Sequence, residues 1–245
     1  WNSGGNNGYS SPVQIPGTTW SKTSSSVNAT FGVKTDGTLW AWGDNEFGEL
    51  GMNTAGHPQM RSSPIQIPGT TWDTPWGAGD GTSFCVKTDG TMWAWGSGTY
   101  GGLAQNNLTS YSSPVQIPGS WSERVDTYTT FGLKTNGTLW SWGGFYKGSS
   151  GTNTGATTFR SSPTQIGTDA TWATVTALLY GGAAVKTDGT MWTWGNNFSG
   201  QLGANFGPPS GTYNRSSPIQ VGTDTTWGGG YTGTVSYTHL RAHET

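Results

Sequence analysis

The sequence predicts an all-β protein, a β-propeller of four-stranded antiparallel blades, from three motifs that repeat along its 245 residues. Ser-Ser-Pro-x-Gln-Ile/Val occurs five times, and its prolines follow one another at intervals of 49 to 55 residues. Lys-Thr-Asp/Asn-Gly-Thr-Leu/Met-Trp-x-Trp-Gly occurs four times, and a lone Trp follows each copy of the first motif. We therefore assign residues 1–234 to tandem repeats, four full and two partial, with a period of about 50 residues.

The second motif is typical of a β-hairpin, because Asp36-Gly37 separates two short apolar segments. An Asp-Gly pair favours the positive φ angles that a two-residue hairpin turn requires. Such a turn would place Val33 opposite Trp40, and Phe31 opposite the second Trp of the motif, on one face of the sheet. The predicted turn residues are Asp36, Gly37, Asp89, Gly90, Asn136, Gly137, Asp188 and Gly189.

The third copy carries Asn136 where the other copies carry Asp. Both side chains suit this turn, but only the carboxylate is charged. Comparison of the copies therefore indicates that Asp36, Asp89 and Asp188 serve the geometry of the turn, and neither metal binding nor acid catalysis.

Two further strands per repeat come from the other motifs. Proline lacks an N–H, so Ser-Ser-Pro-x-Gln-Ile suits a strand start or a sheet edge, and the lone Trp marks another strand. Each repeat thus supplies about four short strands, the number in a propeller blade. We expect the paired tryptophans to form the structural core: Trp40, Trp42, Trp93, Trp95, Trp140, Trp142, Trp192 and Trp194.

The composition is polar and rich in glycine, with 31% hydrophobic and 10% charged residues, 41 Gly and 15 Trp. The regularly spaced tryptophans argue against disorder, because aromatic side chains bury large apolar areas. A net charge of −2 offers no basic field for phosphates, so nucleic acid is not a favoured partner. The sequence has no run of 18 apolar residues, so it predicts no membrane span, and it assigns no cellular location.

Catalysis requires a nucleophile with a base, an acid–base pair or a metal site. Outside the last eleven residues, 235–245, the sequence has one histidine, His57, and its recurring carboxylates are turn residues. The single cysteine, Cys85, stands in an apolar segment and is expected to be buried. His239 and His243 are spaced like metal ligands on a helix, but no third ligand accompanies them. We therefore expect a non-enzymatic protein with no catalytic residue, metal or cofactor.

Chain length varies most after Trp-Gly, where the internal copies differ by up to five residues. Surface loops tolerate such changes, and equivalent loops of a repeat protein lie on one face. We expect these loops, roughly 44–61, 97–111, 144–160 and 196–215, to bind a protein or glycan ligand. The alternative is that their aromatic side chains cap the blade edges. The candidate ligand-binding residues are Asn45, Phe47, Tyr100, Tyr111, Phe145, Tyr146, Phe198 and Tyr213.

The segment 39–51, Leu-Trp-Ala-Trp-Gly-Asp-Asn-Glu-Phe-Gly-Glu-Leu-Gly, followed by Ser-Ser-Pro-Ile-Gln-Ile at 62–67, resembles the regulator of chromosome condensation (RCC1-type) repeat. Similar strings begin at Met92 and Met191, and the resemblance covers residues 1 to about 230. It implies seven-bladed propellers of four-stranded blades, so this chain would be a partial ring. The Gly-x-Leu-Gly element is degraded in the second copy and lost in the third.

The leading hypothesis is a repeat scaffold that binds a protein or surface ligand through these loops. The resemblance implies an alternative, guanine-nucleotide exchange on a small GTPase, although no insertion long enough to form an obvious wedge is present. A carbohydrate-binding propeller is another alternative, and the ultraviolet-B photoreceptors that share this architecture fit least, because only five Arg are present. Residues 235–245 break the repeat and resemble translated sequencing-adapter read-through, so we exclude this tail from the fold.

Overall fold

The computed structural model describes residues 11–56, 60–77, 81–126, 129–154, 159–203 and 214–228, without the side chains of residues 123–126. His57, Tyr213 and the tail at 235–245 lie outside these ranges. The strands are β1 (Trp20–Ser25), β2 (Ala29–Lys34), β3 (Leu39–Gly43), β4 (Arg61–Ile67), β5 (Trp72–Gly77), β6 (Thr82–Lys87), β7 (Thr91–Gly96), β8 (Tyr111–Asp126), β9 (Thr129–Lys134), β10 (Leu139–Gly144), β11 (Phe159–Gln165), β12 (Trp172–Leu178), β13 (Gly181–Lys186), β14 (Met191–Gly195) and β15 (Arg215–Gln220), and one short 3-10 helix, η1, spans Thr99–Gly101.

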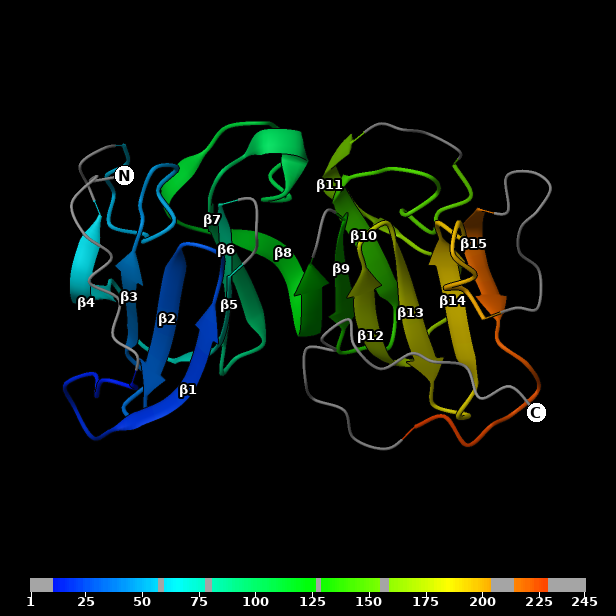
Figure 1. The fold of residues 1–245 in the computed structure, drawn as a ribbon, viewed down its shortest axis with the longest axis horizontal. Helices are drawn as coiled ribbons and strands as arrows, with labels where there is room; N and C mark the ends of the chain where they lie inside the picture. The colour runs from blue at the N-terminus through cyan, green and yellow to red at the C-terminus, as the bar shows by residue number, and fades with distance from the viewer. Residues whose placement is uncertain are drawn as a thin grey trace.

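The strands form four antiparallel blades, which confirms the predicted fold class. Strands β1–β4 form blade 1, and β12–β15 form blade 4. Between them is a seven-stranded sheet, in which the first half of β8 pairs with β7 and the second half pairs with β9. Strand β8 therefore completes blade 2 (β5–β8) and begins blade 3 (β8–β11). Figure 1 shows blades 1 and 4 at opposite ends of the molecule, with blades 2 and 3 between them.

The predicted two-residue turn is wrong by one residue. The N–H of Lys34 donates to the carbonyl of Thr38 at 3.0 Å, and the N–H of Gly37 donates to the carbonyl of Lys34 at 2.9 Å. These bonds close a three-residue loop in which Gly37 has a φ of 77°, the left-handed conformation that ends such a turn.

The longer loop changes the register of the hairpin. Val33 pairs with Leu39, and Phe31 pairs with Ala41, so neither stands opposite a tryptophan as we predicted. Because side chains alternate along a strand, this shift places the paired tryptophans on the face opposite Phe31. Every blade therefore has a tryptophan side and an opposite side with the positions equivalent to 31, 33, 39 and 41. We call the opposite side the aliphatic side after its Val, Leu and Met residues, although position 31 is Phe in three blades.

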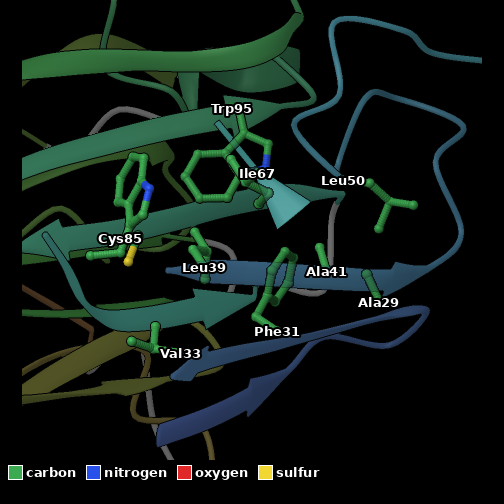
Figure 2. Packing of buried hydrophobic residues seen from close by; sticks show 10 residues of the cluster. Ala29, Phe31, Val33, Leu39, Ala41, Leu50, Ile67, Cys85 and Trp95 are labelled. Atoms are coloured by element: carbon green, nitrogen blue, oxygen red, sulfur yellow. The ribbon is translucent and has the colours of Figure 1, made fainter. Parts of the chain in front are cut away.

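The hydrophobic cores lie between consecutive blades. Figure 2 shows the first of them, in which Phe31 and Leu39 on the aliphatic side of blade 1 lie against Cys85 and Trp95 of blade 2. The second and third clusters repeat this arrangement between blades 2 and 3 and between blades 3 and 4. The aliphatic side of each blade thus packs against the tryptophan side of the next blade.

The second Trp of each Trp-x-Trp-Gly also joins neighbouring blades by a hydrogen bond. In three copies its Nε1–H donates to a main-chain carbonyl of the preceding blade: Trp95 to Glu49 at 2.6 Å, Trp142 to Gly102 at 2.8 Å and Trp194 to Ser149 at 3.1 Å. These three tryptophans are completely buried. Each bond satisfies a polar indole group that packing alone would leave without a partner.

The other five paired tryptophans are partly buried, and three of them, Trp93, Trp140 and Trp192, pack against the core clusters. This group consists of Trp40, Trp42, Trp93, Trp140 and Trp192. Trp40 reaches the edge of the blade, where its Nε1–H donates to the hydroxyl of Thr38 at 2.9 Å and the ammonium of Lys34 lies 4.0 Å from its ring centroid. The same contacts recur at Trp93, Trp140 and Trp192.

Candidate functional site

The loops that follow Trp-Gly begin beside the tips that join the first two strands of each blade. Main-chain hydrogen bonds connect the two in three blades: Asp44 donates to Asn28 at 2.9 Å, Ser97 to Gly81 at 2.9 Å and Asn196 to Tyr180 at 2.8 Å. Loops and tips therefore share one end of the blades, which we call the loop face. The Asp-Gly turns lie at the other end of the same strands, which we call the turn face.

Four of the predicted ligand-binding side chains are exposed on the loop face. The exposed fractions are 42% for Phe47, 48% for Tyr100, 39% for Tyr146 and 78% for Phe198. They come from the loops of blades 1, 2, 3 and 4 respectively. The structure thus brings one large aromatic side chain from each blade to the same end of the molecule.

Two of these aromatic side chains also touch the next blade. The ring of Phe47 lies 2.8 Å from the position that a Cβ on Gly81 would occupy. The ring of Tyr146 meets that of Tyr180 in an edge-on contact, with centroids 5.0 Å apart. These side chains therefore cap the neighbouring blade and still keep part of their surface exposed.

Two other candidates, Asn45 and Phe145, are buried, and this corrects their assignment to ligand binding. Asn45 is 0% exposed, because its side chain accepts a hydrogen bond from the N–H of Leu50 and donates one to the carbonyl of Thr54, both at 2.9 Å. Asn197 makes the equivalent bond to Leu202 in blade 4. These amides hold the loop in shape and are not available to a ligand.

Phe145 is 3% exposed, so it too is a packing residue and not a contact residue. Tyr111, at the start of β8, is partly buried, and its hydroxyl accepts a hydrogen bond from the amide of Asn107 at 3.1 Å. Tyr213 lies outside the described residues.

The sequence analysis missed two apolar side chains on the loop face. Val27 is 77% exposed and Leu179 is 51% exposed, and each lies at the tip between the first two strands of its blade. Both follow the lone Trp of their repeat by seven residues, so alignment of the repeats could have identified them as equivalent tip positions.

The loop of blade 1 carries three carboxylates near Phe47. Glu49 is 6% exposed, and its carboxylate accepts a hydrogen bond from the N–H of Phe47 at 2.8 Å. Burial raises the pKa of Glu49, and the negative charges of Asp44 and Glu46 raise it further. The hydrogen bond between Phe47 and the buried carboxylate of Glu49 holds the loop together from within.

The turn face is polar, and its side chains are engaged in hydrogen bonds within the turns. The hydroxyl of Thr38 donates to the carboxylate of Asp36 at 2.7 Å, and the N–H of Thr38 donates to the same oxygen at 3.0 Å. Hydrogen bonding by Thr38 lowers the pKa of Asp36. The amide oxygen of Asn136 accepts the same two bonds from Thr138, at 2.7 and 3.2 Å.

The residues that the structure describes contain no group of three or more His, Cys, Asp or Glu placed to hold a metal ion. Burial raises the pKa of the Cys85 thiol, and this side chain is 0% exposed. Among the described segments, no helix is long and apolar enough to cross a membrane.

Comparison with known proteins agrees with this architecture. Sequence models of the regulator of chromosome condensation (RCC1) repeat match residues 20–49, 36–86 and 89–125. Human E3 ubiquitin-protein ligase HERC2 is 30% identical over 83 residues, which are 33% of this chain and 2% of HERC2. The regulator of chromosome condensation of Xenopus laevis is 30% identical over 104 residues, which are 42% of this chain and 24% of that protein.

Solved structures share the fold across most of the chain. Prp20p of Saccharomyces cerevisiae superposes with a TM-score of 0.73 at 14% identity and covers 86% of this chain and 53% of its own. Human WBSCR16 gives a TM-score of 0.64 at 17% identity, with 83% and 53% covered. This chain therefore spans about half the length of these structures and less of the sequence relatives.

The repeated four-stranded blades and the bonds between them define a β-propeller repeat protein. Models of the RCC1 repeat match residues 20–86 and 89–125 of this chain, and its fold is similar to that of Prp20p. The blades of the described residues make up a partial ring.

Proposed function

We propose that this chain is a non-enzymatic repeat scaffold that binds a protein ligand through its loop face. The observation that supports the proposal is the set of exposed apolar side chains at this end, with Phe47, Tyr100, Tyr146, Phe198 and Val27 among them. Aromatic side chains are enriched in protein interfaces, because they bury large areas at low cost in conformational entropy.

The contrast between the two ends of the blades favours the loop face. The turn face presents the exposed polar side chains of Asp36, Asp89 and Asn136, which are already engaged in the turns. Proteins of similar fold supply a further motive for a protein ligand: Prp20p was studied for its binding to Gsp1p and histones, and yeast RCC1 was solved bound to Kap60.

The test replaces Phe47, Tyr100, Tyr146 and Phe198 by Ser together and compares parent and variant on protein and glycan arrays. A turn-face variant, with Asp36, Asp89 and Asp188 replaced by Asn, is the matched control. We expect the loop-face variant to lose at least tenfold in affinity for the protein that the parent binds, and the control to keep it. Unchanged binding by a folded loop-face variant would show that the ligand lies elsewhere.

Two alternatives have their own readouts. Selective binding to glycans would favour a lectin-like propeller. Guanine-nucleotide exchange is motivated by the match to the regulator of chromosome condensation, and accelerated release of a fluorescent nucleotide from a small GTPase would reveal it.

A further inference from the structure

The loop face contains three junctions, each formed where the loop of one blade meets the next blade. In each junction a loop glycine packs against the first serine of the Ser-Ser-Pro motif that follows. The pairs are Gly48 with Ser112, Gly101 with Ser161 and Gly148 with Ser216. An asparagine of the same loop donates its N–H to the carbonyl of that serine at 2.6–2.7 Å in all three junctions. The residues before the glycine and the residue before the serine are therefore brought together each time.

Each junction presents one exposed aromatic side chain from its loop. Phe47 is 42% exposed at the junction of blades 1 and 2, Tyr100 is 48% exposed at that of blades 2 and 3, and Tyr146 is 39% exposed at that of blades 3 and 4. Tyr100 has a φ of 56°, a left-handed conformation that is unfavourable for a bulky residue and that clusters at ligand-binding sites. An apolar anchor thus recurs along the loop face at every step from one blade to the next.

The charged residues of the loops are segregated along the same row. Residues 44–61 contain three carboxylates and one Arg, so their formal net charge is −2 with His57 neutral. Residues 97–111 contain no charged residue, residues 144–160 contain Lys147 and Arg160, and residues 196–215 contain Arg215. From blade 1 to blade 4 the loops therefore carry −2, 0, +2 and +1.

The junction of blades 1 and 2 is acidic. Glu46 is exposed and immediately precedes Phe47, and Asp44 is partly buried two residues earlier. Besides burial, the negative charges of Asp44 and Glu46 raise the pKa of Glu49, so their field acts throughout this loop. The guanidinium of Arg61, the basic residue of the same loop, donates to the carbonyl of Met60 at 3.2 Å. A basic group placed beside Phe47 would be attracted by this field.

The other two junctions are basic. Arg160, at the junction of blades 2 and 3, is exposed and forms no ion pair with another described residue. Lys147 and Arg215 belong to the junction of blades 3 and 4, where the ammonium of Lys147 lies 5.0 Å from the ring centroid of Tyr146. An acidic group placed beside Tyr146 would be attracted here, at the opposite end of the row.

We propose that the loop face binds an extended segment of a partner protein with basic side chains at one end, apolar side chains in the middle and acidic side chains at the other end. The basic end lies over the junction of blades 1 and 2, and the acidic end lies over the junction of blades 3 and 4. This inference rests on the proposed protein-binding function and names the kind of segment that the face takes. Complementary charges of this kind fix the orientation of a partner and disfavour partners with another order of charges.

The spacing of the blades sets the length of the segment. Packed sheets lie about 10 Å apart, so the first and third junctions, which are two blades apart, are separated by about 20 Å. An extended chain spans about 3.3 Å per residue, so about six residues separate the basic from the acidic side chains. Apolar side chains at about every third residue would then meet Phe47, Tyr100 and Tyr146 in turn.

A library of random peptides of about 12 residues, twice the expected spacing, tests this order of charges by phage display on the parent chain. We expect the selected peptides to carry Lys or Arg at one end and Asp or Glu about six residues away, in a fixed order, with apolar residues between them. The most enriched peptide is then synthesised with a fluorescent label, and its affinity is measured by anisotropy. Joint replacement of Phe47, Tyr100, Tyr146 and Phe198 by Ser should abolish its binding, which places it on the loop face.

Reversal of the charges at both ends of the row is the decisive step. The triple variant Glu46→Lys, Lys147→Glu, Arg160→Glu removes an attraction and adds a repulsion at each end. If each of these four effects is about twofold, the peptide should bind about 16-fold more weakly. A peptide in which Lys and Glu are exchanged should recover the affinity with this variant. Thr35→Lys with Thr135→Glu is the matched control, at exposed positions of the turn face of the same two blades, and should bind the original peptide like the parent.

The outcomes separate this inference from the proposed function. Selected peptides without a preferred order of charges, or a folded triple variant that binds the original peptide as tightly as the parent, would overturn the inference alone, provided that the Ser variant loses binding. A parent that selects no peptide would also overturn it, while the protein arrays still test the proposed function. Peptides that bind the Ser variant undiminished would overturn both, because they then lie away from the loop face.

Discussion

Replacement of Trp142 by Phe tests the role of the indole hydrogen bonds between blades. Trp142 is 0% exposed, and its Nε1–H donates to the carbonyl of Gly102 at 2.8 Å. Phe keeps an apolar ring but leaves roughly 40 Å³ unfilled, which costs about 1 kcal/mol at about 24 cal/mol per Å³. The carbonyl that loses its donor adds about 1–3 kcal/mol. The free energy of unfolding should therefore fall by about 2–4 kcal/mol.

The same change in blade 2 should cost less. Trp95 donates to the carbonyl of Glu49, which also accepts a hydrogen bond from the hydroxyl of Ser83 at 3.0 Å. After Trp95→Phe this carbonyl keeps one donor, so the hydrogen-bond loss is about 0.5–1.5 kcal/mol. The total for Trp95→Phe should then be about 1.5–2.5 kcal/mol, roughly 1 kcal/mol below that of Trp142→Phe.

Urea unfolding followed by circular dichroism and by tryptophan fluorescence gives both values, and coincident transitions justify a two-state treatment. Adding Ser83→Ala to Trp95→Phe should raise its cost to the level of Trp142→Phe, because the carbonyl of Glu49 then loses both donors. Equal costs for the two single variants, or simple additivity of Ser83→Ala and Trp95→Phe, would refute the reasoning.

Three further predictions concern the turns, one close approach and the thiol. The triple variant Asp36→Asn, Asp89→Asn, Asp188→Asn should unfold at the same temperature as the parent at pH 7, and a drop of several degrees would contradict a turn-only role. Hydrogen bonds from Thr lower the pKa of these carboxyls below their ordinary value of 3.8, so their stabilisation is present above that pH and lost as the pH falls through the folded-state pKa. Between about pH 5 and 3 the parent should therefore lose more thermal stability than the variant. Gly96→Ala should lower the free energy of unfolding by more than about 2 kcal/mol, because φ is 95° and a Cβ would overlap the main chain, whereas Gly56→Ala, with a φ of 94° and open space, should cost about 1 kcal/mol in urea titrations. Cys85 should react with a thiol reagent only at the rate of unfolding, since it is buried and burial raises its pKa; a fast reaction of the native protein would disprove this.

The candidate site could be predicted in part from the sequence, by comparing equivalent positions of the repeats within the chain. That comparison explained the Asp-Gly turns from Asn136 alone. Applied to Asn45 and Asn197, it would also have indicated a structural role, since the same amide recurs at one position in two of the four repeats. Phe145 occupies the position of Asn45 and Asn197 in its own repeat, so the comparison also separates this buried residue from Phe198, which stands one position later. The exposure of Phe198 itself does not follow from the comparison, because it depends on how the blades pack.

The sequence by itself determined the number of strands per repeat, the antiparallel hairpins and the propeller fold, because spaced motifs and Asp-Gly turns act locally. It did not determine the hairpin register, since a one-residue difference in the turn moves Trp40 and Trp42 to the other side of the sheet. Only the tertiary structure decided what those sides do. The carbonyl that accepts from Trp95 lies 46 residues away in another blade, and contacts at such separation depend on how blades pack and not on local pattern.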